Sequence, residues 1–533
     1  MTTRTCSAKI IPDPWHRAGA LLLLVALAVP GAHRTPVRPG SRPAVDLAAL
    51  VRAYRESPSP AGRVTLAAYA DAHAKDLNGS LARLALGVAD YEQKDYANAL
   101  EDLQDLGAKL PAIADYVAYY MGAARVEAND LAGVAQTLMP VRRGPWPSPL
   151  VGRAWLLEAR ALKPGQAAEA VRLLREHYAE LPQPEGAVIL ADCYQAAGDL
   201  QHAAEFYQRV YYSRISGDAA ARAAAALLTL KDSLGSQYPQ PRPRLELERA
   251  GLLLDAREYV EARKAYQTLA AQLTGVDRDL ARVGVGAVDF LSGNTAAAYP
   301  YLRSLEVAAS EADAERLFYL EECARRLTDD DEMRAALERL DGAYPQSPWR
   351  LRALMGVGNR YLVANRPADY MPLYKAVYES FPAEPPAAPS HWRVAFQSYI
   401  ENRDNAAALL REHLEKYPAH STAGAALYFL GRDAEKNRQF PAASIFYTRL
   451  SKTFSNTSYA VLARERLNLP ELKNAGASPE TSEFLLSLAL PQAKPVPVEP
   501  VAATSARVAR SRLLRTAGLN DLADSELRFG ART

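Results

Sequence analysis

The chain has 533 residues, with 63 Lys and Arg against 61 Asp and Glu, which gives a formal charge of +2. This balance leaves no excess of positive charge for nucleic acid or an anionic membrane, so no nucleic-acid partner is expected. With 49% hydrophobic and 23% charged residues, the composition is that of a folded protein and excludes general disorder, collagen and multispan membrane proteins.

The first 32 residues have the pattern of a secretory signal peptide. Arg4, Lys9 and Arg17 precede an apolar run over 18–29, which is short for a membrane span, and small residues follow it. We therefore expect export to the periplasm and an extended mature N-terminus over 33–43. Contact with a membrane is expected only through this signal segment, if it stays uncleaved.

Beyond the signal segment, apolar residues recur three and four positions apart almost throughout. This spacing predicts one amphipathic helix after another, and no convincing alternation of apolar and polar residues predicts a strand. The clearest unit is ILADCYQAAGDLQHAAEFYQRVYY, over 189–212. Here Leu190 lies on a first helix, Gly198 at the turn, and Ala203 and Tyr207 on a second, which is the tetratricopeptide spacing. The sequence thus predicts an all-α fold, an α-solenoid of tetratricopeptide-like helix hairpins.

Proline-rich segments divide this array. We predict N-terminal helical repeats over 44–238, a connector with three prolines, and C-terminal helical repeats over 245–490. A semi-rigid Pro-rich linker is predicted over 491–501, followed by terminal helices over 502–533. Each repeat buries its apolar stripe only against its neighbours, so the default use of such a chain is binding.

The C-terminal half carries more specific motifs. These are AYPQSPWRLRALMGVGNRYL, FPAEPPAAPSHWRVAFQSYI, ALYFLGRDAEKNRQFPAASIFYTRL and FSNTSYAVLARERL, within 343–467, and the closing SARVARSRLLRTAGLNDLADSELRFGART. In this order they resemble the superhelical, U-shaped N-terminal region of soluble lytic murein transglycosylases and the linker helices that follow it. The resemblance implies a role at peptidoglycan.

This chain differs from that family in its catalytic motifs. In that family activity resides in a lysozyme-like domain with a Glu-Ser-x-x-x-Pro-like motif and a later Gly-Leu-Met-Gln-like segment. Glu379-Ser380-Phe381-Pro382 echoes the first motif, but it lies inside the helical array and no second segment follows. We expect no catalytic residue and no catalytic domain in this chain.

The sequence also contains no recognisable metal or cofactor motif. The acidic cluster over 329–332 lacks the spaced ligands of a calcium loop, and the eight histidines form no His-Glu-x-x-His pattern. No glycine-rich phosphate loop follows a strand. We expect neither metal nor cofactor. Cys193 and Cys323 lie in helical, one-sidedly apolar surroundings, and two buried free thiols are favoured over a disulfide.

Candidate binding residues come from two places. Tyrosine is frequent, with 28 residues against 11 phenylalanines, and suits stacking on sugars or lining a peptide groove, although packing between helices explains most of it. The helix after a proline-rich loop begins with an aromatic, charged triplet that we expect to be exposed, although its tryptophan is favoured as a packing anchor. The candidates are His391, Trp392, Arg393, Tyr207, Tyr211 and Tyr212.

These observations support three hypotheses. The first is an exported, non-catalytic scaffold that binds peptidoglycan glycan strands or cell-wall-processing proteins of the envelope. The second is a lytic transglycosylase truncated before its catalytic domain. The third is a tetratricopeptide adaptor for envelope protein assembly.

Overall fold

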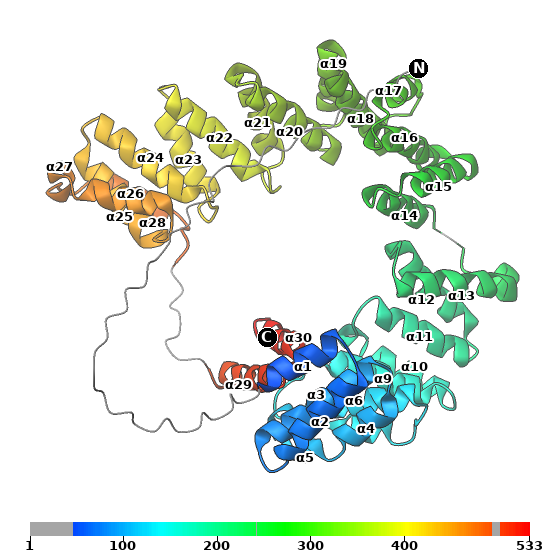
Figure 1. Ribbon diagram of the computed structural model, residues 1–533. Coiled ribbons are helices and arrows are strands. Elements are labelled where there is room, and N and C mark those ends of the chain that lie inside the picture. Colours follow the sequence, from blue (N-terminus) through cyan, green and yellow to red (C-terminus); the bar gives the residue numbers. More distant parts are fainter. Residues whose placement is uncertain (1–45, 241, 493–500, 533) are drawn as a thin grey trace, which may run out of the picture. The chain divides into compact units, whose positions relative to one another are not determined.

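The computed structural model describes residues 46–240, 242–492 and 501–532 (Figure 1). Within these ranges the chain is helical and contains no strand, which confirms the predicted all-α class. The predicted signal peptide and the extended segment over 33–43 lie outside the described residues, as does most of the predicted Pro-rich linker. The domain boundaries therefore stay predictions.

The helices before the connector are short and follow one another closely. Their bounds are α1 (Leu47–Glu56), α2 (Pro60–Ala72), α3 (Leu77–Glu92), α4 (Tyr96–Leu103), α5 (Leu106–Lys109), η1 (Pro111–Ile113), α6 (Ala114–Glu127), α7 (Val134–Thr137), α8 (Met139–Arg143), α9 (Val151–Leu162), α10 (Ala167–Glu176), η2 (Tyr178–Glu180), α11 (Glu185–Ala196), α12 (Leu200–Ser213), α13 (Asp218–Leu234) and η3 (Gly235–Gln237).

After the connector the helices pair more regularly. Their bounds are α14 (Pro243–Asp255), α15 (Tyr259–Gln272), α16 (Gly275–Leu291), α17 (Thr295–Ser304), α18 (Glu311–Leu327), α19 (Asp330–Ala343), α20 (Pro348–Val363), α21 (Pro367–Ser380), α22 (Ala387–Ile400), α23 (Ala406–Lys416), α24 (Ala423–Lys436), α25 (Phe440–Thr453), α26 (Ser458–Leu467), α27 (Pro470–Lys473), α28 (Pro479–Ser487), α29 (Ala502–Thr516) and α30 (Asn520–Gly530).

The helices stack as hairpins. Successive helices pack against each other, and the first helices of successive hairpins also touch, as α14, α16, α18 and α20 do in turn. A hairpin of this kind has no core of its own, so its apolar face is buried only by the hairpins before and after it. The predicted α-solenoid of helix hairpins is confirmed.

The same turn closes many of the hairpins. After α11, Gly198 has a φ of 81° and the Asp199 amide donates to the Tyr194 carbonyl at 3.0 Å. After α18, Thr328 has a φ of 64° and the Asp329 amide donates to the Ala324 carbonyl at 2.9 Å. This is the helix-ending cap in which one residue takes the left-handed conformation. Because many of these left-handed positions hold a residue other than glycine, the repeat is harder to see in the sequence than in the structure.

Small residues allow the two helices of a hairpin to cross closely. A Cβ added to Gly87 of α3 would lie 2.5 Å from Cγ of Leu103 on α4. A Cβ added to Gly431 of α24 would overlap the ring of Tyr447 on α25, which is itself fully buried. At both crossings a small residue therefore faces a large apolar or aromatic side chain.

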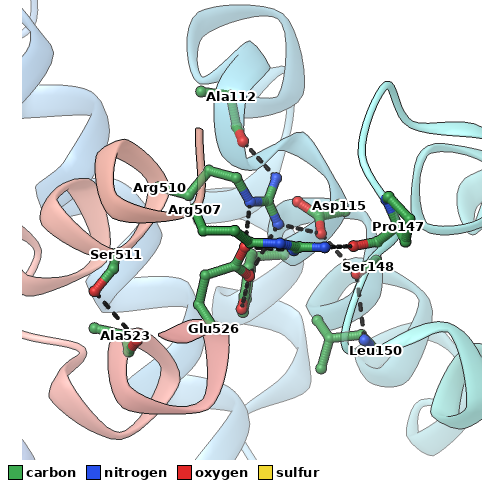
Figure 2. Close-up of polar contacts among 11 residues, drawn as sticks. Ala112, Asp115, Pro147, Ser148, Leu150, Arg507, Arg510, Ser511, Ala523 and Glu526 are labelled. Carbon is green, nitrogen blue, oxygen red and sulfur yellow. Dashed lines mark hydrogen bonds and ion pairs between the residues drawn. The ribbon is translucent and has the colours of Figure 1, made fainter. Parts of the chain in front are cut away.

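The last hairpin, α29 and α30, packs against helices near the start of the array. Helix α29 contacts α1, α3 and η1. Arg510 on α29 donates from Nη2 to Oδ2 of Asp115 on α6 at 2.7 Å and from Nε to Oε1 of Glu526 on α30 at 2.7 Å (Figure 2). Arg507 donates to the same Glu526 oxygen at 2.6 Å, and Tyr116 donates to the other at 2.8 Å. Residues about 400 positions apart in sequence are thereby joined.

This polar cluster is buried and its charges balance. Arg507, Arg510, Asp115 and Glu526 are each at most 6% exposed. Burial acts to raise the pKa of Glu526, but the hydrogen bonds from Arg510 and Arg507 outweigh it and hold that pKa below its usual value. Such a network adds little net stability over apolar packing. Removing one partner, however, leaves a buried charge unpaired and destabilises the fold by about 3–5 kcal/mol. The network therefore fixes where the last hairpin docks.

We predict that Arg510→Met loosens the docking of this hairpin, because Asp115 and Glu526 lose their shared cation. Trypsin cleavage after the exposed Arg515 is expected to become about tenfold faster or more, as followed by mass spectrometry, since proteolysis tracks local opening. Arg512→Met, at an exposed position on the same helix, is the matched control and should leave the rate unchanged. Equal rates in both variants would contradict this role for the cluster.

Candidate functional site

The predicted triplet begins the second turn of α22, but only part of it is exposed. His391 is fully buried, Trp392 is half-buried, and Arg393 is exposed. The expectation of an exposed triplet is therefore wrong for His391, because the helix start after the proline-rich loop packs onto α21 and α23. Trp392 stacks on Phe396 with ring centroids 5.2 Å apart, as expected of a packing anchor.

His391 belongs to a buried histidine cluster. Its Nδ1 lies 3.3 Å from Nδ1 of His413 on α23, and its Nε2 lies 3.5 Å from Oε2 of Glu412. His413 Nε2 lies 2.7 Å from the Thr422 hydroxyl, which also contacts His420 Nδ1 at 2.7 Å. Two imidazoles this close cannot both carry charge at low cost.

Burial keeps these imidazoles neutral. It lowers the pKa of His413 to about 3, with further lowering from the neighbouring His391 and His420. Burial also lowers the pKa of His391, and Glu412 opposes that shift only in part. The cluster therefore belongs to the core at neutral pH, and Arg393 is the one member of the predicted triplet that is free to meet a partner.

The three predicted tyrosines lie on α12 and differ in their surroundings. Tyr207 is buried and donates to Oδ1 of Asp192 at 2.5 Å. Tyr211 packs under the guanidinium of Arg249, which lies 3.8 Å from its ring centroid. Both side chains are held by neighbouring helices, so packing accounts for them. Tyr212 is mostly buried but lines a cavity.

That cavity lies between α12, the proline-rich connector and α14, and its volume is about 660 Å³. Glu205 and Arg209 on α12 line one side, and Arg242 and Glu248 line the other. Gln208 fixes the connector by donating from Nε2 to the Pro239 carbonyl at 2.7 Å. A cavity with both signs of charge and one tyrosine suits a polar protein segment. Sequence reasoning missed these charged residues, although their position beside the connector was a usable signal.

The described residues were compared with the requirements of a metal site and of a membrane-spanning helix. Within the described ranges, no group of three or more His, Cys, Asp or Glu is placed to hold a metal ion. None of the described helices has the length and apolarity needed to span a bilayer. Cys193 and Cys323 are both buried and unpaired, as expected, and burial raises the pKa of each thiol to about 12.

Glu379, which echoes the catalytic motif, lies at the end of α21. Its side chain is about half exposed, and its Oε1 lies 3.6 Å from Nζ of Lys375 one turn earlier. A catalytic acid of glycoside cleavage needs a pKa raised by its surroundings and a cleft that holds the sugar. An exposed carboxylate beside a lysine is the ordinary solvated face of a helix.

Comparisons with known proteins add little. No protein-family model matches the sequence, and no curated protein does. Among solved structures, the TPR domain of P58(IPK) is 14% identical with a TM-score of 0.21, covering 76% of this chain and 97% of that one. The APC/C hetero-tetramer Cut9-Hcn1 is 12% identical with a TM-score of 0.21, covering 85% and 98%. Since these scores are low, the assignment as a helical-repeat protein rests on the stacking and caps described above.

We predict that the histidine cluster makes the fold acid-sensitive. The unfolded chain binds a proton at His413 near pH 6.5, whereas the folded chain does so only near pH 3. Stability is therefore lost as pH falls below 6.5, by up to about 1.4 kcal/mol per pH unit for one such histidine. His413→Gln should flatten the fall in the urea midpoint between pH 7 and pH 4.

His202→Gln is the control, because His202 is exposed, with its Nδ1 beside Asp199 of its own helix start and its ring stacked on Tyr194. The His202→Gln variant should show the same steep fall of the urea midpoint between pH 7 and pH 4 as the unmodified chain. If His413→Gln and the unmodified chain lose stability equally on acidification, the cluster is not the acid-sensitive element.

Proposed function

We propose that the chain is an exported, non-catalytic helical-repeat scaffold that holds cell-wall-processing proteins at the peptidoglycan. The stacked hairpins make the protein a helical-repeat scaffold suited to protein–protein interaction. The observation that carries the proposal is the cavity between α12 and α14, where charges of both signs surround a tyrosine at an interruption of the stack.

The cellular setting of the proposal rests on sequence. The pattern of the first 32 residues supports export. The motifs within 343–467 and the closing segment, which resemble soluble lytic murein transglycosylases, support a place at the cell wall. The motifs cover α20, α22, most of α24, α25 and α26, so the resemblance concerns the scaffold part of that family.

Protein is favoured over glycan as the ligand because none of the described tryptophans is fully exposed. Sugar binding uses exposed aromatic faces, and none of Trp146, Trp155, Trp349 and Trp392 is exposed. Trp155 illustrates the point. Its ring stacks on His177 at 3.8 Å between centroids, and the guanidinium of Arg142 lies 4.8 Å from its centroid. The ring of Trp155 is therefore used for packing within the chain.

The test combines two assays on the full mature chain, purified from the periplasm of an expressing cell. In the first, the chain is sedimented with insoluble peptidoglycan sacculi and the supernatant is analysed for 1,6-anhydro-muropeptides. In the second, envelope preparations are chemically cross-linked before and after lysozyme digests the glycan. We expect no release of muropeptides and a small, reproducible set of cross-linked proteins that survives digestion.

Each of the other outcomes favours a different function for the chain. Release of anhydro-muropeptides would show lytic activity and contradict a non-catalytic scaffold. Saturable sedimentation together with loss of every cross-link after digestion would make glycan the ligand. Cross-links to envelope-assembly proteins alone, without cell-wall enzymes, would favour the tetratricopeptide adaptor.

A further inference from the structure

A second cavity, of about 310 Å³, lies between α21 and α23 with α22 behind it. We call it the α21–α23 pocket. One face of α21 forms a wall that includes Met371 and Tyr378, and α22 contributes Val394 and Ser398. The pocket is distinct from the α12–α14 cavity and contains none of the predicted binding residues.

The buried wall of the pocket is largely apolar, and its hydroxyls are those of Tyr378 and Ser398. Met371, Tyr378 and Val394 are buried, at 7%, 4% and 6% exposure. Ser398 is fully buried, and its Oγ has no hydrogen-bond partner. Buried hydroxyls are almost always paired, so a ligand atom that reaches this one when the covering side chains shift would be stabilised.

Two cationic side chains lie on the rim of the pocket. Lys375 and Arg403 are both exposed and both line it, and the described lining residues include no Asp or Glu. Each cation has an acidic neighbour outside the lining, since Lys375 Nζ lies 3.6 Å from Glu379 and Arg403 Nε lies 2.6 Å from Glu401. These are exposed pairs of small strength, which an incoming carboxylate can replace.

We propose that the α21–α23 pocket receives a tyrosine or tryptophan side chain from an acidic segment of a partner protein. The proposal rests on the proposed function, in that it presumes a protein partner, and it adds the chemistry by which one part of that partner is recognised.

The chemistry of the pocket selects this occupant. An aromatic ring has an apolar body that fits against Met371, Tyr378 and Val394, and the volume has room for one such ring. The phenol O–H or indole N–H at its tip can donate to Ser398 Oγ once the side chains that cover this hydroxyl move aside. Acidic neighbours in the partner's chain take the place of Glu379 and Glu401 beside Lys375 and Arg403, whereas a basic segment meets no carboxylate in the lining of the pocket.

The probes are five pentapeptides, labelled with fluorescein at the N-terminus and amidated at the C-terminus. Four have the form Glu-Glu-X-Glu-Glu, with Tyr, Trp, Leu or Ala at the centre, and the fifth has Tyr between four lysines. Anisotropy is measured with the full chain. We expect the Tyr and Trp peptides to bind about tenfold or more tightly than the Ala peptide, and the lysine peptide to show no saturation.

Ser398→Ala tests the contribution of the Ser398 hydroxyl to peptide binding. It should weaken the Tyr and Trp peptides about threefold to tenfold and leave the Leu peptide unchanged, because leucine has no polar tip. Since the substitution removes an unpaired buried polar atom, the fold should keep its stability, which a melting curve checks. Ser451→Ala is the matched control, because Ser451 Oγ on α25 is also buried and unpaired but lies outside this pocket.

Lys375→Glu combined with Arg403→Glu tests the rim. The pair should weaken every glutamate-flanked peptide about tenfold or more, whereas Lys231→Glu, at an exposed position on α13, should leave them unchanged.

Several results would overturn the proposal. These are absence of binding by the Tyr and Trp peptides, equal affinity for the Ala peptide, or binding that the rim substitutions leave unchanged. Different results would contradict the proposed function of the whole chain. If these peptides bind as expected but envelope cross-linking recovers no protein, the pocket stands and the cell-wall scaffold does not. If cross-links form and the peptides do not bind, the pocket alone is wrong.

Discussion

The constraint on which the rest of the structure depends is the close crossing of paired helices. A hairpin of two short helices cannot bury its apolar face alone, and the face is covered only if neighbouring helices approach closely. At Gly431 the absent side chain leaves room for the ring of Tyr447, and at Gly87 for Leu103. The turns reinforce this spacing, because the left-handed residue and its cap set the angle at which the second helix returns. Stability is therefore local and adds up along the chain.

An array of this kind leaves apolar faces at its ends. Here the hairpin of α29 and α30 packs on α1 and α3, and a buried network with two arginines and two carboxylates fixes the contact. Leu514 and Leu519 of this hairpin share a buried apolar cluster with Val51 of α1. The charges add specificity, because a misplaced hairpin would bury unpaired ions. The cavities described above lie elsewhere, between hairpins, where the spacing of neighbouring helices leaves room.

Much of the fold could be predicted from the sequence, and little of the site. The unit around Gly198 and Tyr207 shows helix spacing directly, so the all-α hairpin array follows from it. Non-glycine caps such as Thr328 carry no such signal. His391 was expected to be exposed because it follows a proline-rich loop, but burial depends on α21 and α23, which sequence spacing does not place. Ser398, Lys375 and Arg403 come from three different segments, so only packing brings them to one pocket.

Hydrogen exchange of Gly431→Ala tests the central claim, that each hairpin is held only by the helices packed directly against it. The added methyl group overlaps the buried ring of Tyr447 and must force α24 and α25 apart. The account predicts faster exchange in α22 to α26 and unchanged exchange in α3 to α6, while Gly342→Ala, at an open helical position, slows exchange slightly or has no effect. Faster exchange spread evenly over the whole chain would contradict it, because stability would then be shared globally.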